Sequence, residues 1–176
     1  PPGGRVLEIG CGTARNLVQA AKAWPEAEFY GFDISSEMLK AARRNLARSG
    51  LAGRITLFHG DAENPALAMP LAVQSYDRIF LSFCLSMIPD WQGAVRQALS
   101  LLAPGGELHI VDFGQSEGLP SPFRALLKQW LALFHVEPRR HLRTFVKELD
   151  AELGTRTEFV PLYRGYSWRF VVRPRA

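Results

Sequence analysis

Apolar segments alternate with helical segments as far as residue 113, and this alternation limits the possible folds more than any other feature of the chain. Five segments rich in β-branched and aromatic residues are expected to form strands: 5–9, 28–32, 54–58, 76–83 and 107–113. Three segments between them carry helix signals: 16–23, 36–49 and 91–102. Strands that alternate with helices typically form a parallel sheet with helices on both faces. We therefore expect an α/β fold.

The pattern changes after residue 113. Apolar residues recur at helical spacing in 122–134, namely Phe123, Leu126, Leu127, Trp130, Leu131 and Phe134. Another helix is expected at 141–153, where Gly154 ends the pattern. Two further strands are expected at 157–162 and 167–172, and Arg164-Gly165-Tyr166 lies between them as a hairpin-like turn. These two strands would close one edge of the sheet.

The chain as a whole is long enough to form one core, because it has 176 residues and no repeat, linker or low-complexity segment. We expect a single domain over residues 1–176. The sequence begins Pro1-Pro2-Gly3-Gly4 without Met, so we expect that it lacks an upstream segment. Its two cysteines, Cys11 and Cys84, have no framework spacing and favour a reducing compartment without a structural disulfide.

The segment VLEIGCGTARN, residues 6–16, places two glycines directly after the first expected strand. Ligands of open α/β sheets bind beyond the carboxyl ends of the strands, and glycine lets the backbone approach a ligand closely. A dinucleotide site needs a third glycine in G-x-G-x-x-G, but Arg15 occupies that position. A phosphate loop needs G-K-[ST], which does not follow Gly12. Because Glu8 would also repel a pyrophosphate, we expect a ligand without phosphate groups.

Acidic residues follow three consecutive expected strands. Glu8 lies at the end of the first strand, Asp33 ends the second, and Asp61 follows the third. A carboxylate at Asp33 can accept two hydrogen bonds from a ribose diol. Asp61 is at the right level to receive an adenine amino group, and Glu8 favours a cationic ligand. S-Adenosylmethionine combines a sulfonium, an ammonium, a ribose diol and an adenine, so the three acids indicate a site for it.

These motifs resemble those of the class I S-adenosylmethionine-dependent methyltransferases. VLEIGCGT is similar to their first motif, GFDIS to their second, HGDAEN to their third, and LLAPGGELHIVDF to the helix and fifth strand that follow the site. Ala14 stands where the family more often has glycine. The resemblance covers residues 5–113 and implies a Rossmann-like seven-stranded sheet, mostly parallel, with an antiparallel last strand and helices on both faces. It implies that S-adenosyl-L-methionine is bound by Glu8, Gly10, Cys11, Gly12, Asn16, Asp33, Ile34, Asp61, Ala62 and Ser82.

A second resemblance begins at the fourth expected strand. SFCLSMIPDW, LHIVDFGQ, FRALLKQWLALFHVEPR and LYRGYSW are similar to segments of the bacterial betaine-lipid N-methyltransferases. This resemblance implies three methylations of the amine of diacylglyceryl-homoserine, and an upstream segment that helps to close the cofactor site. Two alternatives stay open. One is methylation of a small soluble acceptor such as a quinone precursor, and the other is a non-catalytic domain that binds the cofactor or only a partner.

The loop after the fourth expected strand narrows the acceptor class. It reads SFCLSMIP, where methyltransferases of DNA bases and glutamine amides carry [ND]-P-P-[YF]. This difference favours a small molecule or a lipid head group, and we expect no nucleic-acid partner. The sequence identifies no catalytic residue, but Ser82 and Asp112 are candidates to face the acceptor. Tyr163, Tyr166 and Trp168 either form an aromatic cage for cationic intermediates or pack in the closing hairpin.

The C-terminal half carries most of the net charge of +4. Arg139, Arg140 and Arg143 follow the apolar stripe of 122–134, which either covers a sheet face or lies on an anionic membrane surface. His135 and His141 match no metal-site spacing, and we expect no metal. No apolar run reaches the roughly 20 residues that span a bilayer, and no secretory signal is visible. We expect a cytoplasmic protein, with peripheral contact to the inner membrane face as one option.

Overall fold

The structure is a computed structural model that describes residues 2–64, 73, 75–118, 120 and 138–175. Its strands are β1 (Arg5–Ile9), β2 (Glu28–Asp33), β3 (Ile55–His59), β4 (Tyr76–Ser82), β5 (Leu102–Phe113), β6 (Arg156–Leu162) and β7 (Ser167–Arg173). Its helices are α1 (Arg15–Ala23), α2 (Ser36–Ser49), α3 (Trp91–Ser100) and α5 (Leu142–Leu153). Two short 3₁₀ turns complete the described elements, η2 (Leu85–Met87) and η3 (Tyr163–Gly165).

The strands form one seven-stranded sheet in the order β3-β2-β1-β4-β5-β7-β6. Strands β1 to β5 pair in parallel, and β7 runs antiparallel to both of its neighbours. The expected Rossmann-like sheet with an antiparallel last strand is therefore confirmed. The direction of winding reverses between β1 and β4, which is the topological switch point where ligands of such sheets bind.

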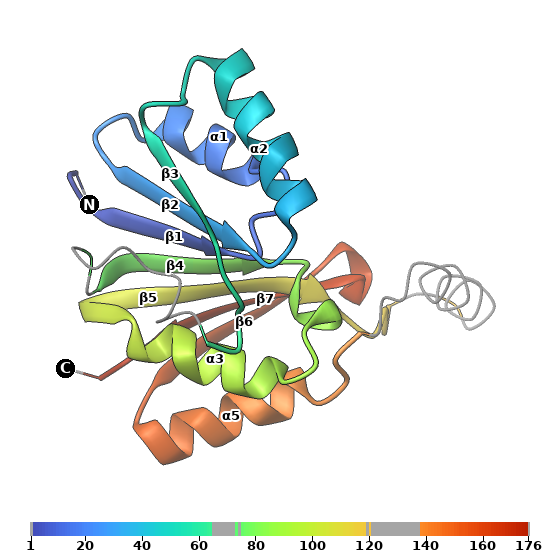
Figure 1. Cartoon of the computed structure of the whole chain (residues 1–176). Coiled ribbons are helices and arrows are strands. Elements are labelled where there is room, and N and C mark those ends of the chain that lie inside the picture. Colours follow the sequence, from blue (N-terminus) through green and yellow to red (C-terminus); the bar gives the residue numbers. More distant parts are fainter. Residues whose placement is uncertain (1, 65–72, 74, 119, 121–137, 176) are drawn as a thin grey trace.

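Helices cover both faces of this sheet (Figure 1). On one face, α1 and α2 bury Leu17 and Leu39 against β2 and β3. On the other face, α3 and α5 bury Val95 and Phe145 against the central strands. Because side chains alternate along a strand, Leu7 of β1 joins the second of these clusters while its neighbours point to the opposite face.

Helix α2 shows how closely local signals set the element boundaries. The Ser35 hydroxyl accepts a hydrogen bond from the backbone N–H of Met38 at 3.3 Å, which caps the first turn. Gly50 ends the helix in the left-handed region at φ 72°, a conformation that favours glycine. The predicted helix over 36–49 therefore agrees with the structure at both ends.

The start of β5 differs from the expectation. The sequence predicts a helix to residue 102 and a strand from residue 107, but α3 ends at Ser100 and β5 begins at Leu102. Leu102 pairs with Tyr76 of β4, and the register shifts before the next pair, Arg78 with Glu107. The Pro104–Gly106 segment is thus an irregularity inside the strand, because pairing with β4 begins before it.

The expected apolar stripe of 122–134 lies outside the described residues, as does His135. In the part of the chain that the structure describes, no helix has the length and apolar character needed to cross a membrane.

Candidate functional site

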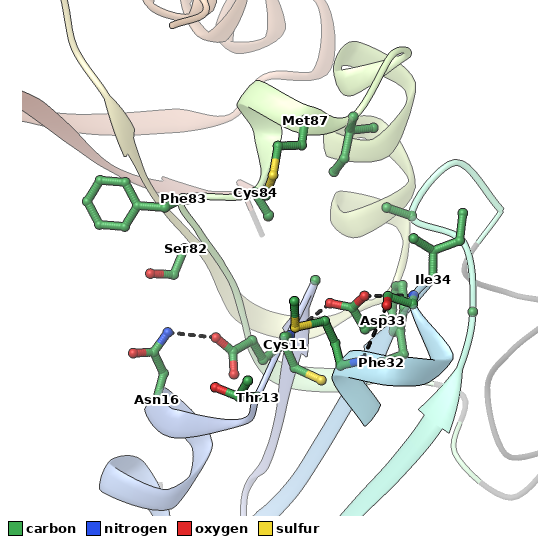
Figure 2. A pocket seen from close by; sticks show the side chains of 18 of the residues that line it. Cys11, Thr13, Asn16, Phe32, Asp33, Ile34, Ser82, Phe83, Cys84 and Met87 are labelled. Carbon is green, nitrogen blue, oxygen red and sulfur yellow. Dashed lines mark hydrogen bonds between the residues drawn. The ribbon is translucent and has the colours of Figure 1, made fainter. Parts of the chain in front are cut away.

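A cavity of about 830 Å³ opens at the carboxyl ends of β1, β2 and β4 (Figure 2). This volume is within the range of small-molecule sites. All the residues that the sequence predicts for the cofactor line it: Glu8, Gly10, Cys11, Gly12, Asn16, Asp33, Ile34, Asp61, Ala62 and Ser82. The structure thus brings together residues from four strand ends.

The turn between β1 and α1 requires unusual backbone angles. Gly10 has a φ of 69° and Gly12 a φ of 52°, and Ala14 adopts a φ of 60° although it is not a glycine. A Cβ on Gly10 would lie 2.8 Å from the Cβ of Cys84, so a side chain does not fit there. A Cβ on Gly12 would meet no atom within 4 Å. The turn therefore brings backbone to the pocket, and Gly10 also lets the loop after β4 approach it.

Asp33, the last residue of β2, joins this turn to the start of α2. Its Oδ2 accepts a hydrogen bond from the backbone N–H of Gly12 at 2.8 Å, and its Oδ1 accepts one from the N–H of Ser35 at 2.8 Å. A carboxylate has about four lone-pair sites, so each oxygen retains acceptor capacity toward the pocket. The two backbone donors fix the orientation of the group before a ligand arrives.

Glu8 is the most deeply buried acid of the pocket, with 1% of its surface exposed. Its Oε1 accepts a hydrogen bond from Asn16 Nδ2 at 2.8 Å, but its Oε2 has no partner among the described residues. Burial raises the pKa of Glu8 to about 8, although the Asn16 hydrogen bond lowers it, and the neighbouring Asp33 raises it further. A cationic ligand would supply both a partner for Oε2 and a charge that favours the carboxylate.

The pocket wall beyond Asp33 combines an apolar surface with another acid. Ile34 is 63% exposed although it is a large apolar residue, and Asp61 and Ala62 follow β3 on the same side. The Asp61 carboxylate accepts a hydrogen bond from the backbone N–H of Glu63 at 2.9 Å. An exposed apolar side chain beside a hydrogen-bond acceptor suits a flat heterocycle with an amino group.

The opposite wall is the segment 83–89 after β4, which we name the pocket-wall loop. Figure 2 shows Cys84 and Met87 of this loop across the pocket from Asp33. Met87 is 61% exposed, and Phe83 is 36% exposed with a positive φ of 52°. Strained non-glycine residues concentrate at functional sites. The sequence of this loop indicated the class of acceptor, but its residue pattern alone could not distinguish pocket wall from core.

Both cysteines are buried at the pocket and carry no disulfide. Burial raises the pKa of the Cys11 thiol and of the Cys84 thiol well above the usual range, and nearby carboxylates add to the rise. A thiol must ionise to act as a nucleophile, so neither has the environment of a reactive cysteine.

The acceptor-side candidates lie outside this cavity, apart from Ser82. Trp168 of β7 is buried and packs edge-to-face on Phe159 of β6, with ring centroids 5.9 Å apart. Tyr163 is 81% exposed, and the ring of Tyr166 packs edge-to-face on that of Phe113, with ring centroids 5.7 Å apart. The three aromatic candidates therefore do not gather into one cage, because the strand alternation turns Trp168 into the core.

Asp112 is also buried, and its carboxylate serves the backbone. Its Oδ2 accepts a hydrogen bond from the N–H of Leu85 at 2.8 Å, and its Oδ1 accepts one from the N–H of Phe113 at 2.7 Å. Burial raises the pKa of Asp112 to about 6, against the effect of these donors. The residue thus contacts the pocket-wall loop from behind.

Two of the three arginines on which the membrane-surface alternative depends have partners within the fold. Arg139 donates to carbonyls of the pocket-wall loop, and the Arg143 guanidinium lies over the ring of Phe159, 4.6 Å from its centroid. Arg140 is exposed. No local sequence signal distinguishes Arg139 from its neighbour, because its partners are more than 50 residues away in the chain.

Comparisons with known proteins agree with this geometry. A family model described as "Methyltransferase domain" matches residues 6–106. The chain is 28% identical over 167 residues to a demethylmenaquinone methyltransferase of Listeria monocytogenes, covering 94% of this chain and 60% of that protein. It is 34% identical over 105 residues to a demethylmenaquinone methyltransferase of Geobacillus kaustophilus, covering 59% of this chain and 43% of that protein. The chain thus spans about 60% of the length of the first of these relatives.

Solved structures share the fold at low sequence identity. An O-methyltransferase family protein from Burkholderia thailandensis superposes with a TM-score of 0.76 at 17% identity, covering 98% of this chain and 51% of that one. An S-adenosylmethionine-dependent methyltransferase from Aquifex aeolicus gives a TM-score of 0.70 at 18% identity, covering 98% of this chain and 83% of that one. At this identity the likeness concerns the fold.

Proposed function

The chain belongs to the methyltransferase-domain family, whose cofactor is S-adenosylmethionine, and from that premise we propose that it transfers a methyl group to a small acceptor of the quinone-precursor class. The observation that carries the cofactor half of this proposal is the meeting of Glu8, Asp33 and Asp61 in one pocket beside the glycine turn. The acceptor half rests on the names of the relatives and on the apolar pocket-wall loop.

The residues present fit the cofactor. The unpartnered Oε2 of Glu8 suits the cationic methionine end, and the oriented carboxylate of Asp33 suits the ribose diol. Ile34 and Asp61 suit the adenine, as an apolar surface and a hydrogen-bond acceptor. A dinucleotide fits less well, because Arg15 stands where a dinucleotide turn has its third glycine, and a pyrophosphate at this turn would give the buried Glu8 carboxyl no cationic partner.

When bound, S-adenosylmethionine supplies an already activated methyl group, which transfers by an in-line displacement. The contribution of the chain is therefore mainly alignment, which can supply roughly 7–11 kcal/mol of a barrier. Glu8 would hold the methionine end of the donor and Asp33 its ribose, and the pocket-wall loop would exclude water from the acceptor side. An electron-rich ring carbon needs no strong base to attack, because its proton is lost only after the new bond has formed.

The quinone-precursor acceptor has more support than the lipid amine. A trimethylated amine calls for aromatic faces around a cation, but Tyr163, Tyr166 and Trp168 do not line the cavity, and Trp168 is buried in the core. The side chains that line the acceptor side are mainly apolar, including Phe83 and Met87. A planar apolar ring matches that wall better than a charged head group does.

A labelled methyl-transfer assay tests the proposal. The protein is incubated with S-adenosylmethionine labelled on its methyl group and either a reduced demethylated naphthoquinone or diacylglyceryl-homoserine in mixed micelles. We expect label in the quinol and none in the lipid, and no transfer by Asp33→Ala. Label in the lipid alone would reverse the choice of acceptor. Binding of S-adenosylhomocysteine without transfer to any methyl acceptor would favour the non-catalytic alternative.

A further inference from the structure

A single arginine side chain bonds three carbonyls of the pocket-wall loop. Arg139 Nε donates to the carbonyl oxygen of Leu85 at 3.1 Å, and its Nη2 donates to those of Ser86 at 3.3 Å and Ile88 at 2.7 Å. A guanidinium is a planar fork of donors, so it can bond several carbonyls at once with fixed geometry. These carbonyls belong to η2 and the residue that follows it.

The loop is held from its other sides by strands of the sheet. Asp112 of β5 accepts from the N–H of Leu85 at 2.8 Å, and the carbonyl of Val111 accepts from the N–H of Phe83 at 2.8 Å. The thiol of Cys84 donates to the carbonyl of Ile9 in β1 at 3.4 Å. Arg139, which belongs to neither of these strands, therefore adds three hydrogen bonds to the loop from another segment.

The position of Arg139 is itself fixed by α5. Its carbonyl accepts a hydrogen bond from the N–H of Leu142 at 3.0 Å, which closes the turn that leads into that helix. Leu142 and Leu149 of α5 are fully buried against the sheet. The backbone of Arg139 is thus joined to a helix of the core, and its guanidinium reaches from there to the loop.

The loop presents its two sides to different surroundings. Leu85 and Ser86 are buried behind the wall, whereas Met87 and Phe83 face the cavity. We infer that Arg139 is a positioning residue, which sets where Met87 and Ile88 meet the bound cofactor and acceptor. It touches neither ligand, because it does not line the cavity. The inference rests on the proposed function in one respect, that the ligand of this pocket is S-adenosylmethionine or its product.

Amide hydrogen exchange and calorimetry on Arg139→Met, Arg139→Lys and Arg140→Met test this role. The methionine keeps much of the stem but no donor, the lysine keeps a compact charge without the fork, and Arg140 is the exposed neighbour that serves as the control. Exchange of the Leu85–Ile88 amides is measured in the ligand-free proteins. The Kd for S-adenosylhomocysteine is then measured at a temperature where every variant is folded.

We expect Arg139→Met to speed exchange in the loop and to raise the Kd about tenfold, with Arg139→Lys in between and Arg140→Met like the wild type. A lowered Tm with unchanged loop exchange or an unchanged Kd would overturn the inference, since a merely structural role predicts that outcome. If the wild type bound no S-adenosylhomocysteine, the proposed function would fail, and unchanged loop exchange in Arg139→Met would still overturn the positioning role.

Discussion

The carboxylate of Asp33 accepts a hydrogen bond from the backbone N–H of Gly12 at 2.8 Å, although the two residues belong to different βα units. The same carboxylate accepts from the N–H of Ser35 at the start of α2. One acid thus holds the two turns that line the pocket at a fixed separation. This arrangement makes Asp33 a test of the cofactor site as a whole.

Asp33→Ala should weaken binding of S-adenosylhomocysteine strongly. Hydrogen bonds to a charged group are worth about 1.5–3 kcal/mol, so losing even one raises the Kd roughly 10- to 150-fold. Isothermal titration calorimetry measures the change. The matched control is Asp77→Ala, because Asp77 accepts from the N–H of Arg5 at 2.8 Å at the amino ends of β1 and β4, away from the pocket. Equal losses of affinity in both variants would point to general destabilisation.

Glu8→Gln should change how stability depends on pH. The pKa of Glu8 is raised from 4.5 to about 8 in the folded chain, so the folded state retains a proton that the unfolded state has lost. The free energy of unfolding of the wild type therefore falls as pH rises through this window, and is lowest above pH 8. Gln cannot ionise and can keep the bond from Asn16. We expect the variant to be more stable than the wild type at pH 9, on the order of a few kcal/mol.

Urea unfolding at pH 5 and pH 9 measures this difference, and calorimetry on the same variant supplies its functional counterpart. The neutral amide should bind the cationic donor more weakly, because the variant has no negative charge where the wild type has the Glu8 carboxylate. If stability of the two proteins followed the same pH profile, the carboxyl of Glu8 would not hold its proton in the folded chain.

Gly10→Ala and Gly12→Ala should differ in stability although both glycines have positive φ. At Gly12 the added methyl group meets nothing, so the cost is backbone strain of about 1–2 kcal/mol. At Gly10 the methyl group would also press on Cys84, so the total is roughly 2–5 kcal/mol. Chemical denaturation of the two variants gives the comparison. Equal costs would show that the loop after β4 moves away from the turn easily.

Trp168→Phe should destabilise the fold and leave the cofactor site intact. Trp168 is buried against Phe159 and Phe170, so a smaller ring leaves space in the core at a cost of roughly 1–2 kcal/mol. The Trp168 Nε1 has no partner among the described residues, so no hydrogen bond is lost there. Thermal unfolding should show a lower Tm, and the Kd for S-adenosylhomocysteine should not change. A changed Kd, measured where the variant is fully folded, would show that Trp168 affects the cofactor site in addition to packing in the core.

Much of the fold was predictable because its signals are local. The cap at Ser35, the end of α2 at Gly50 and the closing strands all lie within one or two residues of the sequence prediction. Where a distant partner decided the boundary, prediction was less accurate. β5 begins at Leu102, before the predicted start at residue 107, because Leu102 pairs with Tyr76 of β4. The segment 104–106, Pro-Gly-Gly, locally predicts a turn instead of a strand.

That the acids after β1, β2 and β3 line one pocket could also be predicted from the sequence, since parallel strands bring their carboxyl ends together and each acid lies at or just after a strand end. The placement of Glu8 and Asp33 at the pocket could therefore be predicted without knowledge of side-chain packing. The family and its cofactor follow from those motifs. The identity of the methyl acceptor does not follow from those motifs, because residues that follow the same strand can face the cavity, the core or solvent.

The tertiary structure decided the rest. It turned Trp168 into the core, directed Asp112 to the backbone of Leu85, and brought Arg139 to a loop more than 50 residues earlier in the chain. Such contacts depend on strand register and helix docking, which no single stretch of sequence specifies. The sequence by itself determined the sheet and the chemistry of the strand ends, because these depend on short-range periodicity. Only the packed fold determined which side chains shape the opposite wall, because that wall is built by contacts between distant segments.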